Sequence, residues 1–192
     1  SVTASGTITQ SGALTVGGTS SFSTTGNDQA ITLDTAGNAV SGTVTFTTQS
    51  SGANAGDVTF DNGTTAVDLG STTVAGTLDV TSGNASGITD SAAVSVTDGA
   101  TFTTDANSGV INLDTLELSG GDLTLITDGT GNATVVNNSG INFALSNVGG
   151  ALDLTASGDI TQSGAITAGV TTLDPSGNSI TLDSGNVLDD VT

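Results

Sequence analysis

Apolar and polar residues alternate along most of the chain in short runs. In the run 44–46, Val44 and Phe46 would share one face of an extended strand and Thr45 would lie on the other, because side chains alternate in a β-strand. The same arrangement recurs at residues 58–60, 78–80, 123–125 and 152–154. Clusters of Gly, Asn, Asp and Ser separate these runs and favour tight turns. The pattern predicts many short strands.

Helix is not expected, because no apolar stripe with a 3.6-residue period persists and the helix formers Lys, Arg and Met are absent. Residues 50–56 are interpreted as a long polar loop. The single proline, Pro175, lies in a polar segment between two predicted strands, so it is also interpreted as a loop residue.

Internal repetition is present at a long period. Residues 2–19 match residues 154–171 at an offset of 152, with 13 of 18 positions identical. Residues 88–94 follow residues 8–14 at an offset of 80 and form a third copy. The repeat unit is therefore about 70 to 80 residues long, with copies starting near residues 5, 86 and 157. No linker interrupts the repetition, so residues 1–192 are predicted to form a single continuous unit.

Short strands that each present one apolar face bury it best when successive coils stack in register. We therefore predict an all-β fold, a parallel β-helix (β-solenoid) of about ten rungs with roughly 20 residues and three short strands in each rung. The residues predicted to lie inside are Leu14, Phe22, Ile31, Leu33, Val44, Phe46, Val58, Phe60, Leu78, Val80, Val94, Val96, Phe102, Ile111, Leu113, Leu123, Leu125, Leu152, Leu154, Ile160, Ile166, Ile180 and Leu182. The alternative is a pair of Greek-key sandwiches of about 90 residues each, joined by hairpin turns.

The charge of the chain has one sign only. The sequence carries 19 acidic residues and no Lys, Arg, His or Cys, with a formal net charge of −19. Catalysis by Cys, Ser–His pairs or Schiff-base Lys, and metal sites built on His or Cys, each need a residue type that is missing. Nucleic acid and anionic lipid are not expected partners, since they bind mainly through Lys and Arg. No apolar run approaches the roughly 20 residues of a membrane span, so membrane insertion is not expected either.

Paired carboxylates are the catalytic groups that remain. A glycosidase needs two of them at a defined separation in a cleft, and the candidate pairs are Asp57 with Asp61 and Asp189 with Asp190. Aromatic Trp and Tyr, which would hold a sugar, are absent. We therefore predict that the chain is not an enzyme and has no catalytic residue.

Three aspartates recur at one place in the repeat. Asp34, Asp114 and Asp183 each follow an apolar triplet, ITL or INL. They are the candidate calcium ligands, because calcium takes carboxylate and carbonyl oxygens. The other interpretation is that each ends a strand and accepts backbone hydrogen bonds in the next turn. The second interpretation is preferred, so no metal or other cofactor is predicted, and calcium is left open.

Thr-x-Thr pairs occur at residues 7/9, 43/45, 45/47 and 101/103. Such pairs would suit an ice-binding face only if they stacked in consecutive rungs on one flat side. Thr-x-Asp and Ser-x-Val interrupt them, and alternating Thr is also the ordinary outward residue of a strand.

Several phrases resemble a known family. GTITQSGALTV at residues 6–16, GDITQSGAIT at 158–167, ITLDTAGNAV at 31–40 and GTVTF at 42–46 resemble the repeat region of filamentous-haemagglutinin-like exoproteins of two-partner secretion systems. The resemblance implies a right-handed parallel β-helix that forms the shaft of a very large secreted bacterial surface protein, commonly an adhesin. The Asn-Pro-Asn-Gly type motif of the family's secretion domain is not found in this sequence.

The sequence therefore predicts a non-catalytic structural and adhesive shaft segment of a secreted bacterial cell-surface protein or extracellular filament. Expected partners are rods of the same type or the continuing parent chain, including head-to-tail assembly, and host-cell or surface glycans. The alternatives are a carbohydrate-binding or carbohydrate-cleaving β-helix and an ice- or calcium-binding module.

Overall fold

The computed structural model describes residues 1–52 and 56–192, so the middle of the predicted loop 50–56 lies outside the described residues. The described part of the chain contains 23 strands and no helix. The strands are β1 (Val2–Ala4), β2 (Ile8–Thr9), β3 (Thr15–Val16), β4 (Ser20–Asn27), β5 (Ile31–Leu33), β6 (Ala39–Val40), β7 (Val44–Gln49), β8 (Val58–Asp61), β9 (Val67–Leu69), β10 (Thr72–Val74), β11 (Thr77–Ser82), β12 (Ile88–Asp90), β13 (Val94–Val96), β14 (Gly99–Thr104), β15 (Ile111–Leu118), β16 (Asp122–Thr127), β17 (Ala133–Asn137), β18 (Ile141–Phe143), β19 (Ser146–Asn147), β20 (Leu152–Ala156), β21 (Ile160–Gln162), β22 (Ile166–Asp174) and β23 (Val187–Val191).

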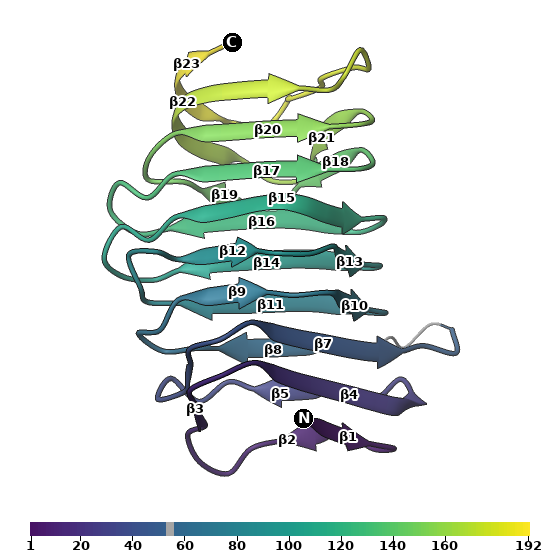
Figure 1. Ribbon diagram of the computed structural model, residues 1–192. Helices are drawn as coiled ribbons and strands as arrows, with labels where there is room; N and C mark the ends of the chain where they lie inside the picture. The colour runs from purple at the N-terminus through teal and green to yellow at the C-terminus, as the bar shows by residue number, and fades with distance from the viewer. Residues whose placement is uncertain (53–55) are drawn as a thin grey trace.

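The strands wind into a β-solenoid, which confirms the predicted fold class (Figure 1). The chain climbs from the N-terminus at the bottom of Figure 1 to the C-terminus at the top, and its front strands run from left to right, so the coil is right-handed. Within the described residues, 21 strands form one sheet and β3 pairs with β6, and the pairings are parallel. Parallel pairing excludes the Greek-key sandwiches, whose strands are antiparallel.

The coil has about eight rungs where the sequence predicted about ten. The rungs are longer than expected, because the loops at the corners vary in length. One rung takes 27 residues from Ile31 to its partner Val58, and another takes 19 residues from Ala133 to its partner Leu152.

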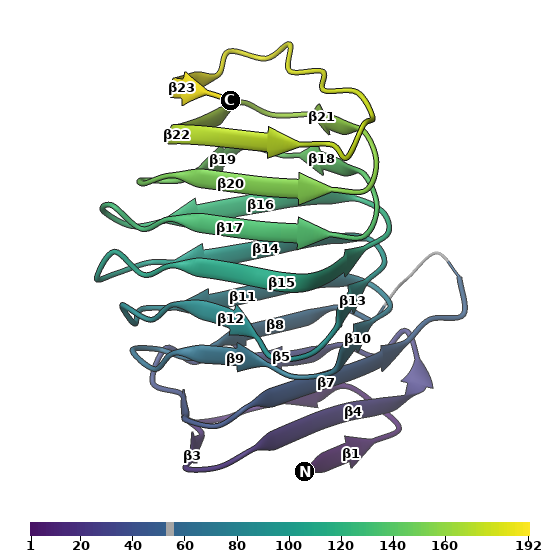
Figure 2. The same ribbon diagram turned by 45° about the horizontal axis from the view of Figure 1, so that its top comes forward.

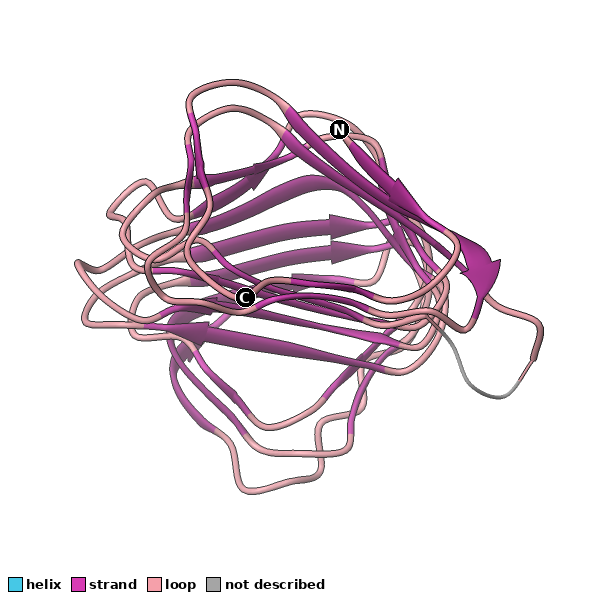
Figure 3. Ribbon diagram, turned by 90° about the horizontal axis from the view of Figure 1, so that it is seen from below, coloured by secondary structure: helices cyan, strands magenta, loops and turns pink. Residues whose placement is uncertain are grey.

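Each rung has two broad faces, which are opposed in Figure 2. The front face consists of β1, β4, β7, β9, β10, β12, β13, β15, β17, β20 and the second half of β22. The back face consists of β2, β5, β8, β11, β14, β16, β18, β19, β21, the first half of β22, and β23. Viewed along the axis, the coil encloses a single interior (Figure 3).

The sequence repeat is not a whole number of rungs. From Ile8 in β2, three steps up the back face lead to Leu78 in β11, and the repeat copy of Ile8, Ile88, lies half a rung further on, in β12 of the front face. Four more steps on the back face reach β21, which contains the third copy, Ile160. An offset of 80 residues therefore spans three and a half rungs, and an offset of 152 spans seven.

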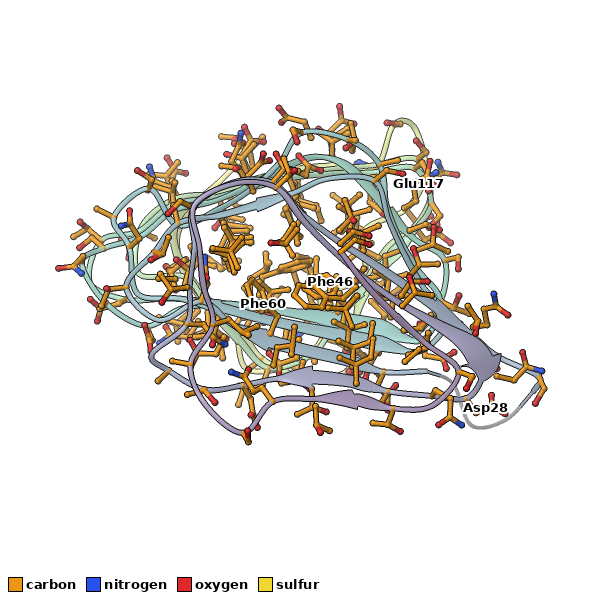
Figure 4. The ribbon with its side chains drawn as sticks, turned by 60° about the horizontal axis from the view of Figure 1, so that its bottom comes forward. Asp28, Phe46, Phe60 and Glu117 are labelled. Atoms are coloured by element: carbon orange, nitrogen blue, oxygen red, sulfur yellow. The ribbon has the colours of Figure 1, made fainter. Side chains whose placement is uncertain are left out.

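The core is apolar and runs along the whole axis. Of the residues predicted inside, all are buried except Leu14, Ile180 and Leu182. These three lie in the first and last rungs, which have a neighbour on one side only, and Leu14 lines a hollow of about 440 Å³ at the lower end. Phe46 stacks on Phe22 with ring centroids 5.9 Å apart and meets Phe60 of the opposite face at 5.4 Å, in the interior shown in Figure 4.

Buried threonines close the corners of the rungs. Thr104 and Thr127 end strands on the back face, and their hydroxyls donate to the carbonyls of Gly109 and Gly131 at 2.8 and 2.7 Å. Thr24 does the same on the front face, donating to the carbonyl of Gln29 at 3.1 Å. These hydroxyls satisfy buried backbone acceptors that the ladder leaves unpaired where the chain turns.

Candidate functional site

The structure does not bring the three recurring aspartates together. Asp34, Asp114 and Asp183 are all exposed. Asp114 lies in β15 on the front face, whereas Asp34 follows β5 on the back face. Asp183 follows Ile180, which stacks on Ile160 seven rungs above Ile31, a separation of about 34 Å at 4.8 Å per rung. Among residues 1–52 and 56–192, no three acidic side chains are close enough to hold a metal ion.

Several other aspartates join one rung to the next. Asp57 accepts a hydrogen bond from the backbone N–H of Thr77 at 2.8 Å, and Asp159 accepts one from the N–H of Ser179 at 2.9 Å. Asp61, the sequence partner of Asp57 in the glycosidase alternative, accepts from the N–H of Gly63 at 2.8 Å. Carboxylates are acceptors only, so each satisfies a donor that a turn leaves free.

The other carboxylate pair of that alternative lies in the last strand. Asp189 and Asp190 are consecutive residues of β23, and both are exposed. Successive side chains of a strand point to opposite faces, so the two carboxylates diverge.

A row of threonines runs up the back face. Its members are partners in register on successive strands from β2 to β16: Thr9, Thr32, Thr59, Asp79, Thr101 and Thr124. Asp79 is the only carboxylate in this row. A groove of about 450 Å³ lies beside it, lined by Asp79, Asp98, Asp122, Thr77, Thr101 and Thr124 among others.

Asp79 has an unusual electrostatic environment. Loss of hydration raises the pKa of its carboxyl above the ordinary value, and the negative charge of Asp61 on the neighbouring strand raises it further. The chain has no Lys, Arg or His to oppose this effect. Asp79 is therefore the carboxylate of the back face whose charge costs the fold most clearly.

Asp122, at the edge of the groove, belongs to a polar network over three rungs. Its two carboxylate oxygens accept from the amide of Asn142 at 2.6 Å and from the hydroxyl of Ser163 at 2.7 Å. Thr161 donates in turn to the amide oxygen of Asn142 at 2.9 Å. The network fixes outward side chains of β16, β18 and β21 against one another.

The front face carries a second hydroxyl row. Thr3, Ser23, Thr47, Thr73 and Ser95 are partners in register over five strands, and Glu117 follows them. Glu117 lies on the outside of the coil (Figure 4). The Thr-x-Thr pairs do not stack on one another, because those at residues 43–47 lie on the front face and the pair at 101/103 lies on the back face. Both faces can therefore display hydroxyl groups at the spacing of the rungs.

The sequence reasoning missed a pair of buried amides. The Gln–Asn pair of the first repeat consists of Gln10 and Asn38, whose side chains exchange two hydrogen bonds at 2.8 and 3.0 Å. Asn38 is 2% exposed, and its amide also pairs with the N–H of Leu14 and the carbonyls of Leu33 and Asp61. The amide thus takes the place of a backbone group in the ladder.

The same pair recurs in the third repeat. Gln162 and Asn186 exchange hydrogen bonds of 3.0 and 2.8 Å, and the oxygen of Asn186 accepts from the N–H of Ile166 at 2.8 Å. In the second repeat Asp90 stands where the others have Gln. Its carboxylate accepts from the N–H of Asp114 and from the N–H and hydroxyl of Thr115, each at 2.9 Å. The signal was in the sequence, since Gln and a Gly-Asn dipeptide recur in the first and third copies.

No helix in the described part of the chain is long and apolar enough to cross a membrane.

Comparison with known proteins identifies the repeat. A model of the family described as "Repeats of unknown function (DUF5649)" matches residues 1–47, 55–126 and 130–192. The second and third matched segments start 75 residues apart, which agrees with the repeat length of about 70 to 80 residues read from the sequence. Neither the curated proteins nor the solved structures gave a match. Because the matched segments cover nearly the whole chain, the chain belongs to this family of repeats.

Proposed function

We propose that this chain is a non-catalytic shaft segment of a large secreted bacterial surface protein of the filamentous-haemagglutinin-like kind that its repeat phrases resemble. The observation that carries the proposal is the uninterrupted parallel ladder from β1 to β23, with one apolar core along its axis. A ladder of this kind supplies length and stiffness without any catalytic group.

The mechanical argument follows from the direction of the hydrogen bonds. In a solenoid the backbone hydrogen bonds between rungs run along the axis, and each rung contacts only its neighbours. About eight rungs at 4.8 Å give a segment roughly 38 Å high. Further repeats would lengthen such a rod without changing its cross-section.

The adhesive part of the proposal rests on the two hydroxyl rows, which repeat a neutral polar surface at every rung. A surface glycan offers matching hydroxyl groups and no charge. The net charge of −19 keeps neighbouring rods apart laterally, so contact with other copies or with the continuing chain belongs at the ends of the rod.

The mechanical role is tested by pulling the chain from its two ends in a single-molecule force experiment. Wild type should extend in steps of about one rung, roughly 20 to 27 residues, as rungs peel off in turn. Leu125→Asp buries a charge at a position that is 0% exposed and should create a weak point at that rung. Thr124→Asp, on the outward side of the same strand, is the matched control and should pull like wild type. Loss of all structure in a single event at low force would contradict the shaft.

The location is tested on producing cells. Antibody raised against the folded segment should label intact cells or their medium, with no increase after permeabilisation. Labelling confined to permeabilised cells would overturn a secreted surface protein.

A further inference from the structure

The chain has one proline, and an aspartate precedes it. Asp174 is exposed at the end of β22, and Pro175 begins the loop that leads to the last rung. We infer that the Asp174–Pro175 bond is a self-cleaving site that acid activates, with water as the second reactant. The cleavage would separate residues 1–174 from residues 175–192.

The loop holds the carboxylate beside the bond. Oδ1 of Asp174 accepts a hydrogen bond from the backbone N–H of Ser176 at 2.7 Å. The ring closed by this hydrogen bond contains the Asp174–Pro175 peptide bond, so the carboxyl group stays near the carbonyl carbon that it would attack. A carboxyl group that is already positioned avoids the entropic cost of a free encounter.

The backbone that follows is tightly turned. Ser176 and Gly177 both have positive φ, at 49° and 89°. Ser176 has a side chain, so its left-handed conformation is strained. Asn178 holds the turn closed by donating its backbone N–H and its side-chain amide to the carbonyl of Pro175, at 3.0 and 2.9 Å. The turn therefore limits rotation about the residues next to the bond.

The chemistry needs no other residue. A carboxyl oxygen of Asp174 forms a bond to the backbone carbonyl carbon of Asp174 and gives a five-membered cyclic anhydride. The C–N bond to Pro175 breaks, and the carboxyl proton moves to the proline nitrogen, which leaves as a secondary amine. Water then opens the anhydride and leaves Asp174 with two free carboxyl groups. No electron transfer is involved.

Acid should activate this step while the coil stays folded. Most proteins become strongly cationic in acid, but this chain has no Lys, Arg or His, so protonation of its 19 acidic side chains leaves it close to neutral. After cleavage, β23 would still pair with β22 over four residues in register. The two pieces would therefore stay associated until the coil is unfolded.

The experiment incubates the purified chain at pH values from about 3 to 7, spanning the ordinary pKa of Asp, and follows its intact mass in denaturant. Wild type should yield two products, residues 1–174 and 175–192, at a rate that rises as the pH falls. Native size-exclusion chromatography of the same sample should still show one species. Asp174→Asn and Pro175→Ala should each reduce cleavage by at least about tenfold, since each removes one group of the reaction. Scission at many Asp residues, or none at Asp174, would overturn the inference.

The contribution of the fold is measured separately with a synthetic peptide of residues 168–182. If the loop positions the carboxylate, the folded chain is cleaved at least several-fold faster than the peptide at the same pH. Equal or slower cleavage of the folded chain would refute the positioning. Circular dichroism of each variant in neutral buffer shows whether it has folded, and Asp174→Glu, whose anhydride would need a six-membered ring, should be slower than wild type.

Discussion

The first and third repeats differ from the second in the group that joins two rungs. Gln10 and Gln162 each pair with a buried or half-buried asparagine, whereas Asp90 pairs with the backbone and hydroxyl of Thr115. The amide is both donor and acceptor, so it needs a partner that is also both. The carboxylate is an acceptor only, and it lies opposite two N–H groups and one O–H group.

The difference also follows the geometry of the coil. The two Gln–Asn pairs lie on the back face, and Asp90 ends β12 on the front face. The same repeat position is therefore compatible with either face, provided that the partner in the next rung is changed with it. Substitutions at these positions test how far the two solutions can be exchanged.

The largest effect is expected from Asn38→Ala. The change leaves the N–H of Leu14 and the carbonyls of Leu33 and Asp61 without their partner, and each unsatisfied buried group costs about 1–3 kcal/mol. We expect a loss of about 2–4 kcal/mol in the free energy of unfolding by urea, and faster hydrogen exchange at Leu14. Asn112→Ala, on the outward side of β15, is the control and should change stability by less than about 0.5 kcal/mol. A similar loss in both variants would show that the buried amide contributes nothing special.

A smaller effect is expected from Asp90→Asn. The new amide keeps an acceptor for one N–H but turns a donor toward Thr115, so we expect a loss of about 1–2 kcal/mol at neutral pH. The loss should occur although the variant carries one negative charge fewer. Asp114→Asn removes the same charge from an exposed carboxylate and should be neutral or slightly stabilising. The comparison between carboxylate and amide fails if the two variants behave alike.

Salt separates general repulsion from specific binding. Since the chain has no cationic side chain, raising monovalent salt should raise the melting temperature by screening repulsion among the carboxylates. Calcium at matched ionic strength should add little, because Asp34, Asp114 and Asp183 do not converge. A large calcium-specific rise would make these three residues ligands again, and their Asn variants would identify which of them binds.

The smallest effect contrasts two carboxylates with opposite pKa shifts. Loss of hydration and Asp61 raise the pKa of Asp79, so its contribution to stability is fully present below the unfolded pKa and is lost as the pH rises through the folded pKa. Hydrogen bonds from Ser51 lower the pKa of Asp28, so its contribution is present above the unfolded pKa and is lost as the pH falls through the folded pKa. At neutral pH, Asp79→Asn should therefore raise the melting temperature and Asp28→Asn should lower it. Melting curves between about pH 3 and 7 check both signs, and both differences should shrink in acid.

The fold was predictable because one simple rule governs most positions. Alternation placed Val44 and Phe46 inside and Thr45 outside, and the structure agrees. The number of rungs was overestimated, because corner loops such as the one between β7 and β8 lengthen the rung without leaving an apolar signal. Threonines such as Thr104 were expected outside and are buried, since their hydroxyls serve the corner carbonyls.

The candidate sites were less predictable, because recurrence in sequence is not proximity in space. Asp34 and Asp114 recur at one repeat position, yet a half-integral number of rungs places them on opposite faces. The pairing of Gln10 with Asn38 joins residues 28 positions apart. Both residues recur in the third copy, but only the register of the rungs shows that they meet.

The half-rung phase of the repeat also bears on how such genes change. Gain or loss of one unit of three and a half rungs would turn every surface beyond it to the opposite side of the rod, while two units would restore the original orientation and only alter the length. Unequal recombination between the copies would therefore act as a rotation as well as an extension. Lineages under selection to keep one side facing a partner should accordingly vary by even numbers of units.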